Sequence, residues 1–191
     1  MTIFTIGHST RSLEEFIGLL RNAGADYIVD VRRFPHSRRQ PQFNIEILPA
    51  ALAEFSIGYT HMPALGGRRK ERSDGTPSPN TLWREKAFRN YADYAETKEF
   101  HVALDALIGL EKTKRAAIMC AEALWWQCHR RIISDYLLAA EIEVEHILGD
   151  KIQPAHLTEG AIIKPDGGVL YSDTPLLAAE RGLSTAPPKN T

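Results

Sequence analysis

The chain has 191 residues and a formal net charge of −1, with 43% hydrophobic and 25% charged residues. This composition is that of a globular protein and excludes disordered and collagen-like classes; we expect one α/β domain over residues 1–175 and a partly frayed tail over 176–191. No apolar stretch reaches the roughly 18 residues of a spanning helix, and the N-terminal run predicts a strand, so we expect a cytoplasmic protein with no membrane partner. No pattern in the chain specifies an oligomeric state.

Short β-rich runs alternate with helical patterns, which is typical of a parallel sheet covered by helices. Five strands are predicted, at Ile3–Gly7, Tyr27–Val31, Tyr59–Met62, Ala116–Cys120 and Glu143–Ile147. We expect the first and fourth of them to be adjacent at the centre of the sheet. The predicted fold class is therefore α/β, with an open, mostly parallel sheet between helices on both faces, a Rossmann-like three-layer arrangement.

Helices are predicted in the connections. Ser12-Leu13-Glu14-Glu15 forms a capping box, which starts a helix that runs to about Asn22 and stops at Gly24. Further helices are expected around Ile45–Phe55, on both sides of Thr97 and after the fourth strand. Residues 162–171 predict a C-terminal hairpin that turns at Asp166-Gly167-Gly168.

Basic residues are unevenly distributed along the chain. Residues 32–72 hold eight basic and three acidic groups, a net +5, whereas the remainder carries −6. A local excess of arginine in a near-neutral protein favours an anion site over a general nucleic-acid surface. A solvated basic face would have the same composition.

Polar side chains follow four of the predicted strands where each strand ends. In chain order they are His8 with Ser9, Asp30 with Arg32 and Arg33, Gly66 and Gly67 with Arg68, and Cys120 with Glu122. Ligands bind outside the carboxyl ends of strands in open parallel sheets. We therefore expect these residues to meet at one edge.

The helix after the fourth strand carries one apolar stripe. Its members are Ile132, Ile133, Tyr136, Leu137 and Ala140. Cys128 and His129 lie four residues before the first two, which predicts both of them in the helix on its buried face, with Arg130 towards a flank. Packing alone also explains a buried cysteine or histidine here.

Several segments, taken together, resemble a known family. They are Thr5-Ile6-Gly7-His8-Ser9, Asp30-Val31-Arg32-Arg33-Phe34-Pro35, Ser37-Arg38-Arg39, Leu65-Gly66-Gly67-Arg68, Tyr91-Ala92-Asp93-Tyr94, Cys120-Ala121-Glu122 and Cys128-His129-Arg130. The set resembles the bacterial and archaeal family catalogued as domain of unknown function 488, over nearly the whole chain. The resemblance implies an α/β fold and a shared site, but no reaction.

Two specific motifs are absent from the cysteine segment. A zinc deaminase would add a Pro-Cys-x-x-Cys pair, and a phosphatase loop would place an arginine soon after its nucleophile, whereas the first arginine after Cys120 is Arg130, ten residues on. Two general interpretations stay open. In the first, Cys120 is a nucleophile of lowered pKa, Glu122, His129 or His8 transfers protons, and packing protects Cys128 from reaction. Alternatively, zinc or iron is bound by Cys120, Cys128, His129 and His8.

The arginines indicate the ligand. Arg32, Arg33, Arg38, Arg39, Arg68 and Arg130 are expected around one mouth, together with Ser9 and Asp30. Guanidinium groups recognise phosphate, and the backbone of Gly66 and Gly67 allows an anion to approach closely. The favoured partner is an anionic small molecule or nucleic acid, and the leading hypothesis is an enzyme acting on it. A non-catalytic nucleotide or nucleic-acid binding module and a metal-binding or redox protein are the alternatives.

Overall fold

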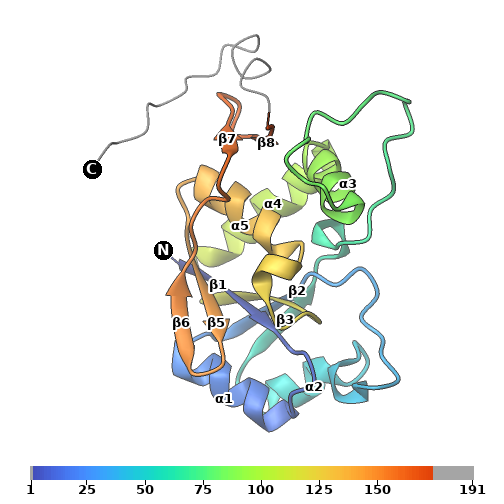
Figure 1. The fold of residues 1–191 in the computed structure, drawn as a ribbon. Helices are drawn as coiled ribbons and strands as arrows, with labels where there is room; N and C mark the ends of the chain where they lie inside the picture. The colour runs from blue at the N-terminus through green and yellow to red at the C-terminus, as the bar shows by residue number, and fades with distance from the viewer. Residues whose placement is uncertain (1, 174–191) are drawn as a thin grey trace.

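The computed structural model describes residues 2–173, so the tail predicted at 176–191 lies outside the described residues. Its centre is a six-stranded sheet with the order β3-β2-β4-β1-β5-β6 (Figure 1). The strands are β1 (Thr2–Gly7), β2 (Tyr27–Asp30), β3 (Gly58–His61), β4 (Ala116–Cys120), β5 (Glu143–Leu148) and β6 (Lys151–Pro154). All neighbours except β5 and β6 are parallel, and β4 and β1 pair at the centre, as predicted.

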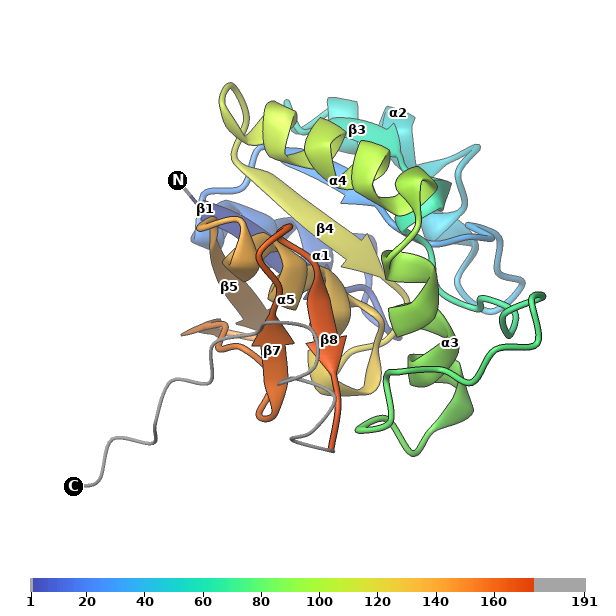
Figure 2. The same ribbon diagram turned by 90° about the horizontal axis from the view of Figure 1, so that it is seen from above.

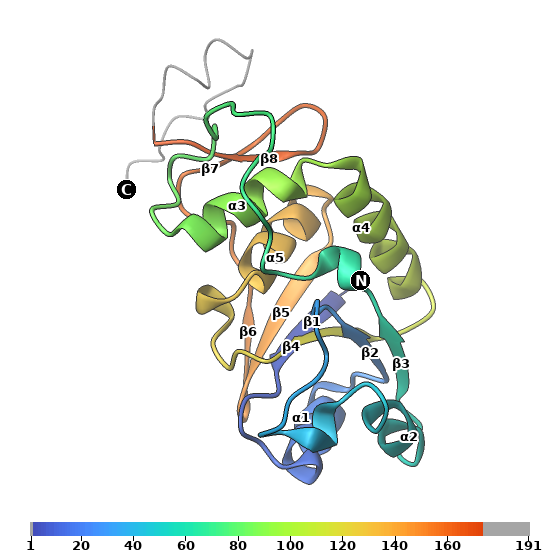
Figure 3. The same ribbon diagram turned by 90° about the vertical axis from the view of Figure 1, so that its right-hand side faces the viewer.

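Helices cover both faces of this sheet (Figure 3). They are α1 (Leu13–Ala23), α2 (Leu48–Ala53), α3 (Lys86–Ala95), α4 (Lys98–Glu111) and α5 (Arg130–Ala139), with short 3-10 turns η1 (Pro41–Phe43), η2 (Pro63–Leu65) and η3 (Trp125–Gln127). One buried cluster joins α1 and α2 to the sheet through Phe4 and Ile6, and a second joins α3, α4 and α5 to it through Ile3 and Val29. The predicted three-layer α/β class is confirmed.

The first helix forms as its sequence predicts. Ser12 Oγ accepts a hydrogen bond from the backbone amide of Glu15, at 3.1 Å, and so satisfies one free donor at the helix start. Gly24 ends the helix in the left-handed conformation, with φ 72°, which costs a residue without Cβ little.

Some element boundaries, and one strand, differ from the sequence-based expectation. The third strand begins at Gly58, and the helix expected at Ile45–Phe55 is only Leu48–Ala53. The edge strand β6 was not predicted, because all four of its residues are exposed and show no apolar alternation. It pairs antiparallel with β5 and forms one edge of the sheet.

A hairpin lies against α5, as Figure 2 shows, and consists of β7 (Ala161–Ile163) and β8 (Val169–Tyr171). The predicted C-terminal hairpin is thereby confirmed. Tyr171 is buried and donates from its hydroxyl to Asp135 Oδ2 on α5, at 2.8 Å. A backbone amide of the approaching segment, Thr158 N–H, donates to the other oxygen of the same carboxylate.

The chain reverses direction across the sheet between β1 and β4. From β1 it runs through α1 to β2, and from β4 it runs through α5 to β5, on the opposite face and towards the opposite edge. The backbone amides of His8 and Ser9 donate to the carbonyls of Cys120 and Ala121, at 2.9 Å each, so the two strand ends stay together. Such a switch point is where open α/β sheets bind ligands.

Candidate functional site: a thiol and imidazole pocket at the switch point

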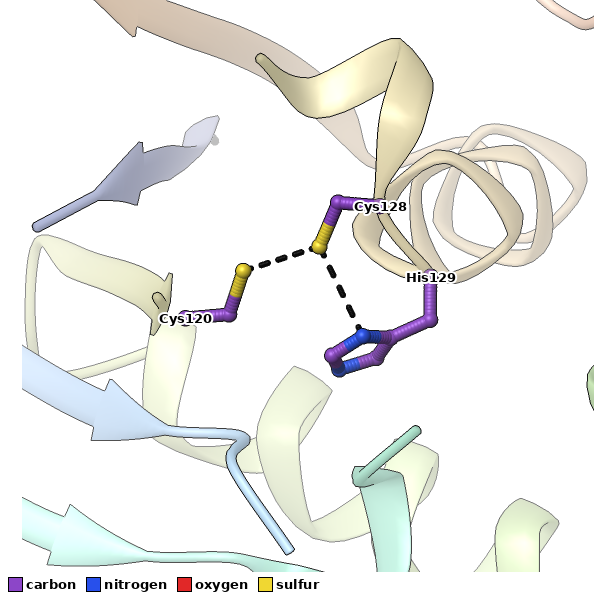
Figure 4. Close-up of side chains that lie close together, drawn as sticks. All are labelled: Cys120, Cys128 and His129. Atoms are coloured by element: carbon purple, nitrogen blue, oxygen red, sulfur yellow. Dashed lines mark hydrogen bonds between the residues drawn. The ribbon is translucent and has the colours of Figure 1, made fainter. Parts of the chain in front are cut away.

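Two thiols and an imidazole meet beyond the end of β4, as Figure 4 shows. Cys120 Sγ lies 2.8 Å from Cys128 Sγ, and Cys128 Sγ lies 3.5 Å from His129 Nδ1. Both cysteines are reduced, and each is only 3% exposed. Cys120 is the last residue of the strand, whereas Cys128 follows the turn η3 and directly precedes His129.

The position of the second thiol differs from the prediction. We expected Cys128 and His129 inside the helix, but α5 begins at Arg130, with His129 as its N-cap. Cys128 has an extended backbone, with φ −133° and ψ 150°, because its amide closes the preceding turn on the carbonyl of Trp125. The expected buried face is nevertheless correct, since Cys128 packs in the core with Ile132 and Ile133.

Arg130 is buried beside the thiols and not at the flank of the helix. It is 1% exposed, its Nη2 donates to the carbonyl oxygen of Glu122 at 2.6 Å, and its Nε donates to Cys128 Sγ at 3.4 Å. A guanidinium in this place stabilises an anionic sulfur. It also holds the segment between the two cysteines against the start of α5.

The two thiols differ in how readily each loses its proton. Burial raises the pKa of Cys120 well above its ordinary value, and the hydrogen bond to Cys128 raises it further. Burial alone would also raise the pKa of Cys128, but the hydrogen bond from Cys120, His129 and the Arg130 charge lower it well below its ordinary value. Cys128 is therefore the thiol that ionises first, with Cys120 as the hydrogen-bond donor to its sulfur, the reverse of the expected lowered pKa at Cys120.

His129 is oriented by the backbone of β2. Its Nε2 lies 3.1 Å from the carbonyl oxygen of Val31, which can only accept, so Nε2 carries a proton. The Nδ1 atom, on the sulfur side, then has a lone pair for the Cys128 proton. Tyr91 packs against the ring at 5.2 Å, and its hydroxyl donates to the carbonyl of Leu65 at 2.6 Å.

A buried ion pair forms the opposite wall of the site. Asp30 accepts from Arg32 Nε at 2.8 Å and from Nη2 at 2.5 Å, and Tyr59 donates its hydroxyl to the same carboxylate at 2.8 Å. Arg32 Nη2 also donates to the carbonyl of Phe43, at 2.6 Å. The Arg32 guanidinium is thus directed inward, so the structure does not present it as the anion anchor that we expected.

His8 belongs to this ion-pair network. Its Nδ1 donates to the carbonyl of Ser9 at 3.0 Å, its Nε2 accepts from Arg32 Nη1 at 3.2 Å, and its ring stacks on Phe43 at 4.3 Å. Burial, helped by the Arg32 charge, lowers the pKa of His8 to about 4. The ring is therefore neutral near pH 7 with both nitrogens engaged, which makes it a packing and orienting group in this geometry.

A cavity of about 510 Å³ opens over the thiols. The predicted site residues that line it are His8, Arg32, Arg33, Gly67, Arg68, Cys120, Glu122, Cys128 and His129. The predicted residues outside the lining are Ser9, Asp30, Arg38, Arg39, Gly66 and Arg130. Most of the strand-end residues therefore gather as expected, whereas Arg38 and Arg39 are exposed and are not among the residues that line the cavity.

The arginines at the cavity differ in how they are held. Arg33 is exposed, and its Nη1 donates to the carbonyl of Arg68 at 2.9 Å. Arg68 adopts a left-handed backbone, with φ 57°, which is uncommon for a residue with a Cβ and recurs at functional sites. These two guanidinium groups are the cavity-lining cations directed towards solvent.

Glu122 and the glycines contribute mainly through the backbone. The side chain of Glu122 is exposed at the cavity, while its carbonyl accepts from Arg130 and its amide donates to Cys120 Sγ at 3.3 Å.

A Cβ at Gly7 would overlap the carbonyl of Glu122, and a Cβ at Gly67 would come within 2.9 Å of His129 Nδ1. Both glycines are needed for close packing at the site.

Several lining residues were not predicted as site residues. They are Phe34, His36, Ser37, Ala87, Phe88, Tyr91, Ala121 and Gln127. Phe34 is 63% exposed beside Arg33, an unusual environment for a phenyl ring. The segments around Phe34, Ser37 and Tyr91 did carry the family resemblance, which was the signal that could have identified them.

The three ligand atoms of Cys120, Cys128 and His129 lie within 4.8 Å of one another. Two sulfurs and an imidazole suit zinc or iron, and the Val31 carbonyl fixes the tautomer that such a ligand needs. The Arg130 guanidinium, hydrogen-bonded to Cys128 Sγ, opposes a second cation at the same sulfur. His8 is not part of this group, because its nitrogens bond to Ser9 and Arg32.

The fold and site define an α/β protein with a thiol and imidazole pocket at the switch point of its sheet. The family model described as Domain of unknown function DUF488 matches residues 12–137, which include both cysteines and the arginine segment, and the chain belongs to this family. Neither the curated proteins nor the solved structures contain a significant match to the chain. Among residues 2–173, no helix has the length and apolar character that crossing a membrane requires.

Proposed function

We propose that this protein is an enzyme that acts on a phosphate-bearing substrate, a nucleotide or a nucleic-acid end, with Cys128 as its nucleophile. The observation that carries the proposal is the environment of Cys128 Sγ, which has His129 Nδ1 at 3.5 Å and Arg130 Nε at 3.4 Å at the base of the cavity. A nucleophile, a base and a group that orients the base are the parts that covalent catalysis needs. Val31 is the orienting group.

His129 has a defined part in this chemistry. Its Nδ1 takes the proton from Cys128 as the thiolate forms, while Nε2–H remains on the carbonyl of Val31. The thiolate then attacks an electrophilic centre of the substrate, the bond between that centre and its leaving group breaks, and a covalent intermediate on Cys128 forms. The imidazolium can return its proton to the leaving group, because His129 lines the same cavity.

The substrate class follows from the cavity wall. Arg33 and Arg68 supply cationic donors for a phosphate, and Phe34 and Phe88 supply aromatic faces on which a base can stack. A volume of about 510 Å³ lies within the ordinary range of small-ligand sites. An anion with an attached flat ring system fits this combination better than an inorganic anion does.

The proposal is tested with four nucleoside monophosphates, inorganic phosphate and a short single-stranded oligonucleotide. Calorimetry should show nucleotide or oligonucleotide binding that weakens in Arg33→Ala/Arg68→Ala. The matched control Arg38→Ala/Arg39→Ala removes the same charge outside the cavity and should change binding little. Equal weakening in both double variants would indicate a general basic surface instead.

Catalysis is tested separately from binding. Mass spectrometry after incubation with each bound compound should find product, or an adduct on the Cys128 peptide, that is lost in Cys128→Ser. Binding that persists in Cys128→Ser without turnover by the wild type would favour the non-catalytic binding module. Stoichiometric zinc or iron in the freshly purified protein, bound to Cys120, Cys128 and His129, would favour the metal protein.

A further inference from the structure

The two thiols at the base of the cavity are the only cysteines in the chain. Cys120 is fixed by β4, which is hydrogen-bonded on both sides, to β1 and to β2. Cys128 lies outside regular structure, after a turn. Their sulfur atoms are 2.8 Å apart, and a disulfide needs about 2.05 Å, so less than about 1 Å separates the present contact from a bond.

The segment between the cysteines has room to follow such a change. Residues 121–127 are exposed or half-buried, and η3 is a single 3-10 turn. Trp125 stacks on His146 at 4.1 Å and anchors the middle of this segment to β5, while Trp126 is 41% exposed. Only the end next to Cys128 needs to shift, while β4 stays in place.

The surroundings of the two sulfurs are unequal. Cys128 Sγ is next to His129 and accepts from Arg130 Nε, whereas Cys120 Sγ faces Cys128 Sγ and the backbone of Glu122. A redox pair of cysteines needs this asymmetry, with one sulfur that attacks an oxidant and a neighbour that resolves the product. Both sulfurs also line the cavity, so a small oxidant has access to them.

We propose that Cys128 is a site of oxidation by hydroperoxides and that Cys120 resolves the product as a reversible intramolecular disulfide. The inference rests on Cys128 as the reactive thiol of the proposed function, but not on a phosphate-bearing substrate. Disulfides in reducing compartments are mostly transient and catalytic or redox-sensing, and a dithiol reductant would restore this pair.

Each step of the oxidation is balanced. The Cys128 thiolate attacks one oxygen of hydrogen peroxide, the O–O bond breaks, and the products are a sulfenic acid on Cys128 and hydroxide, which takes a proton from solvent. Cys120 sulfur then attacks Cys128 sulfur, the S–O bond breaks, and the Cys120 proton leaves with the hydroxyl group as water. Two electrons pass from the dithiol to the peroxide, which is reduced to water.

The disulfide would switch the site off without damaging it. Formation of the bond removes the negative charge that Arg130 stabilises and the nucleophile that His129 serves. It also protects Cys128 from irreversible oxidation to the sulfinic acid, which a sulfenic acid without a resolving thiol reaches with excess peroxide. When the oxidised protein is unfolded, alkylation of both cysteines should be lost, and it should return after reduction.

The experiment treats chelator-washed, reduced wild-type protein with increasing hydrogen peroxide, blocks free thiols with iodoacetamide and maps the peptides by non-reducing mass spectrometry. We expect a Cys120–Cys128 linked peptide within the monomer, with a mass loss of two hydrogen atoms, reversed by dithiothreitol. Sulfinic acid on Cys128 without a linked peptide would overturn the proposal, as would disulfide-linked dimers or no oxidation at a moderate excess of peroxide.

Two variants assign the roles of the sulfurs. In Cys120→Ser a dimedone probe should trap sulfenic acid on Cys128, and further peroxide should give sulfinic acid. In Cys128→Ser the remaining Cys120 should oxidise much more slowly, and equal rates for the two variants would overturn the assignment. If the disulfide forms but no nucleotide binds, the proposed substrate class fails and the redox pair stands. If the protein binds and turns over a nucleotide but forms no disulfide, the redox pair fails and the proposed function stands.

Discussion

Gly67 lies directly against the imidazole of His129, and a Cβ at this position would come within 2.9 Å of the ring nitrogen Nδ1. The same nitrogen faces Cys128 Sγ. The absence of a side chain at Gly67 therefore determines how close the base can lie to the thiol. The carbonyl of Val31 holds the opposite ring nitrogen, Nε2. A Cβ at position 67 would therefore force the imidazole to tilt.

We predict that Gly67→Ala slows alkylation of Cys128 at neutral pH, because the added methyl group turns Nδ1 away from the sulfur. The measurement is the rate of iodoacetamide labelling of the Cys128 peptide. Gly18→Ala, in the middle of α1 with no atom near its would-be Cβ, is the control. It should leave labelling unchanged and stabilise the fold by up to about 1 kcal/mol. An unchanged rate in Gly67→Ala would mean that His129 does not activate Cys128.

The Asp30–Arg32 pair should be a main contributor to stability at this edge of the sheet. Asp30 is 0% and Arg32 7% exposed, so Asp30→Asn leaves a buried cation without its counter-charge. We expect a loss on the order of 3 kcal/mol in the free energy of unfolding, measured by urea denaturation. Glu71→Gln, which breaks the exposed pair with Lys86, should have little effect. Similar losses in both variants would contradict the importance of burial.

The sequence was sufficient to predict the fold because each central strand is a short apolar run followed by a turn signal. The pairing of β1 with β4 followed from the alternation of strands and helices, and it brought His8 and Cys120 to one edge. The strand β6 escaped prediction because it has no buried residue, and an exposed edge strand leaves no apolar pattern.

The site could be located from the sequence but not assigned atom by atom. The apolar stripe of α5 correctly predicted that Cys128 lies on the buried side. The residue at which the helix begins depends on the turn closed at the carbonyl of Trp125, and the apolar periodicity of the sequence does not reveal that turn. The order in which the thiols ionise depends on the hydrogen bond between them, on contact with His129 and on the Arg130 charge. Such contacts exist only in three dimensions.

Two buried histidines should make stability depend on pH. Burial is the largest cause that lowers the pKa of His8 and of His146, each from 6.5 to about 4. Below pH 6.5 the histidines of the unfolded chain bind protons, whereas these two histidines in the folded protein stay neutral. The free energy of unfolding should therefore fall as pH falls from 6.5 towards 4. The expected loss is on the order of 2–3 kcal/mol for each histidine.

Urea denaturation at a series of pH values tests this dependence. His8→Gln should make the curve between pH 6.5 and 4 less steep, because glutamine does not titrate there, while His146 keeps its own contribution. His36→Gln, at an exposed histidine, is the matched control and should leave the slope nearly unchanged. A wild-type curve that stays level across this interval would show that the two histidines bind protons as readily in the folded protein as in the unfolded chain.

The last prediction concerns which thiol is ionised. Because the pKa of Cys128 is lowered and that of Cys120 is raised, Cys128 should be alkylated at neutral pH, while Cys120 reacts only at much higher pH or after unfolding. The measurement is the pH dependence of iodoacetamide labelling of each cysteine peptide, repeated with chelator to remove any protection by a metal. Preferential labelling of Cys120 at neutral pH would reverse the assignment.

A pair of substitutions at Cys120 identifies the cause of this asymmetry. Cys120→Ser keeps a hydroxyl that can donate to Cys128 Sγ, whereas Cys120→Ala removes the donor. We therefore expect the pKa of Cys128 to rise more in the alanine variant, and each unit of rise lowers its thiolate fraction at pH below the pKa about tenfold. If both variants label Cys128 like the wild type, the hydrogen bond from Cys120 does not hold the thiolate. Arg130 and His129 must then suffice, since they are the remaining groups that stabilise its charge.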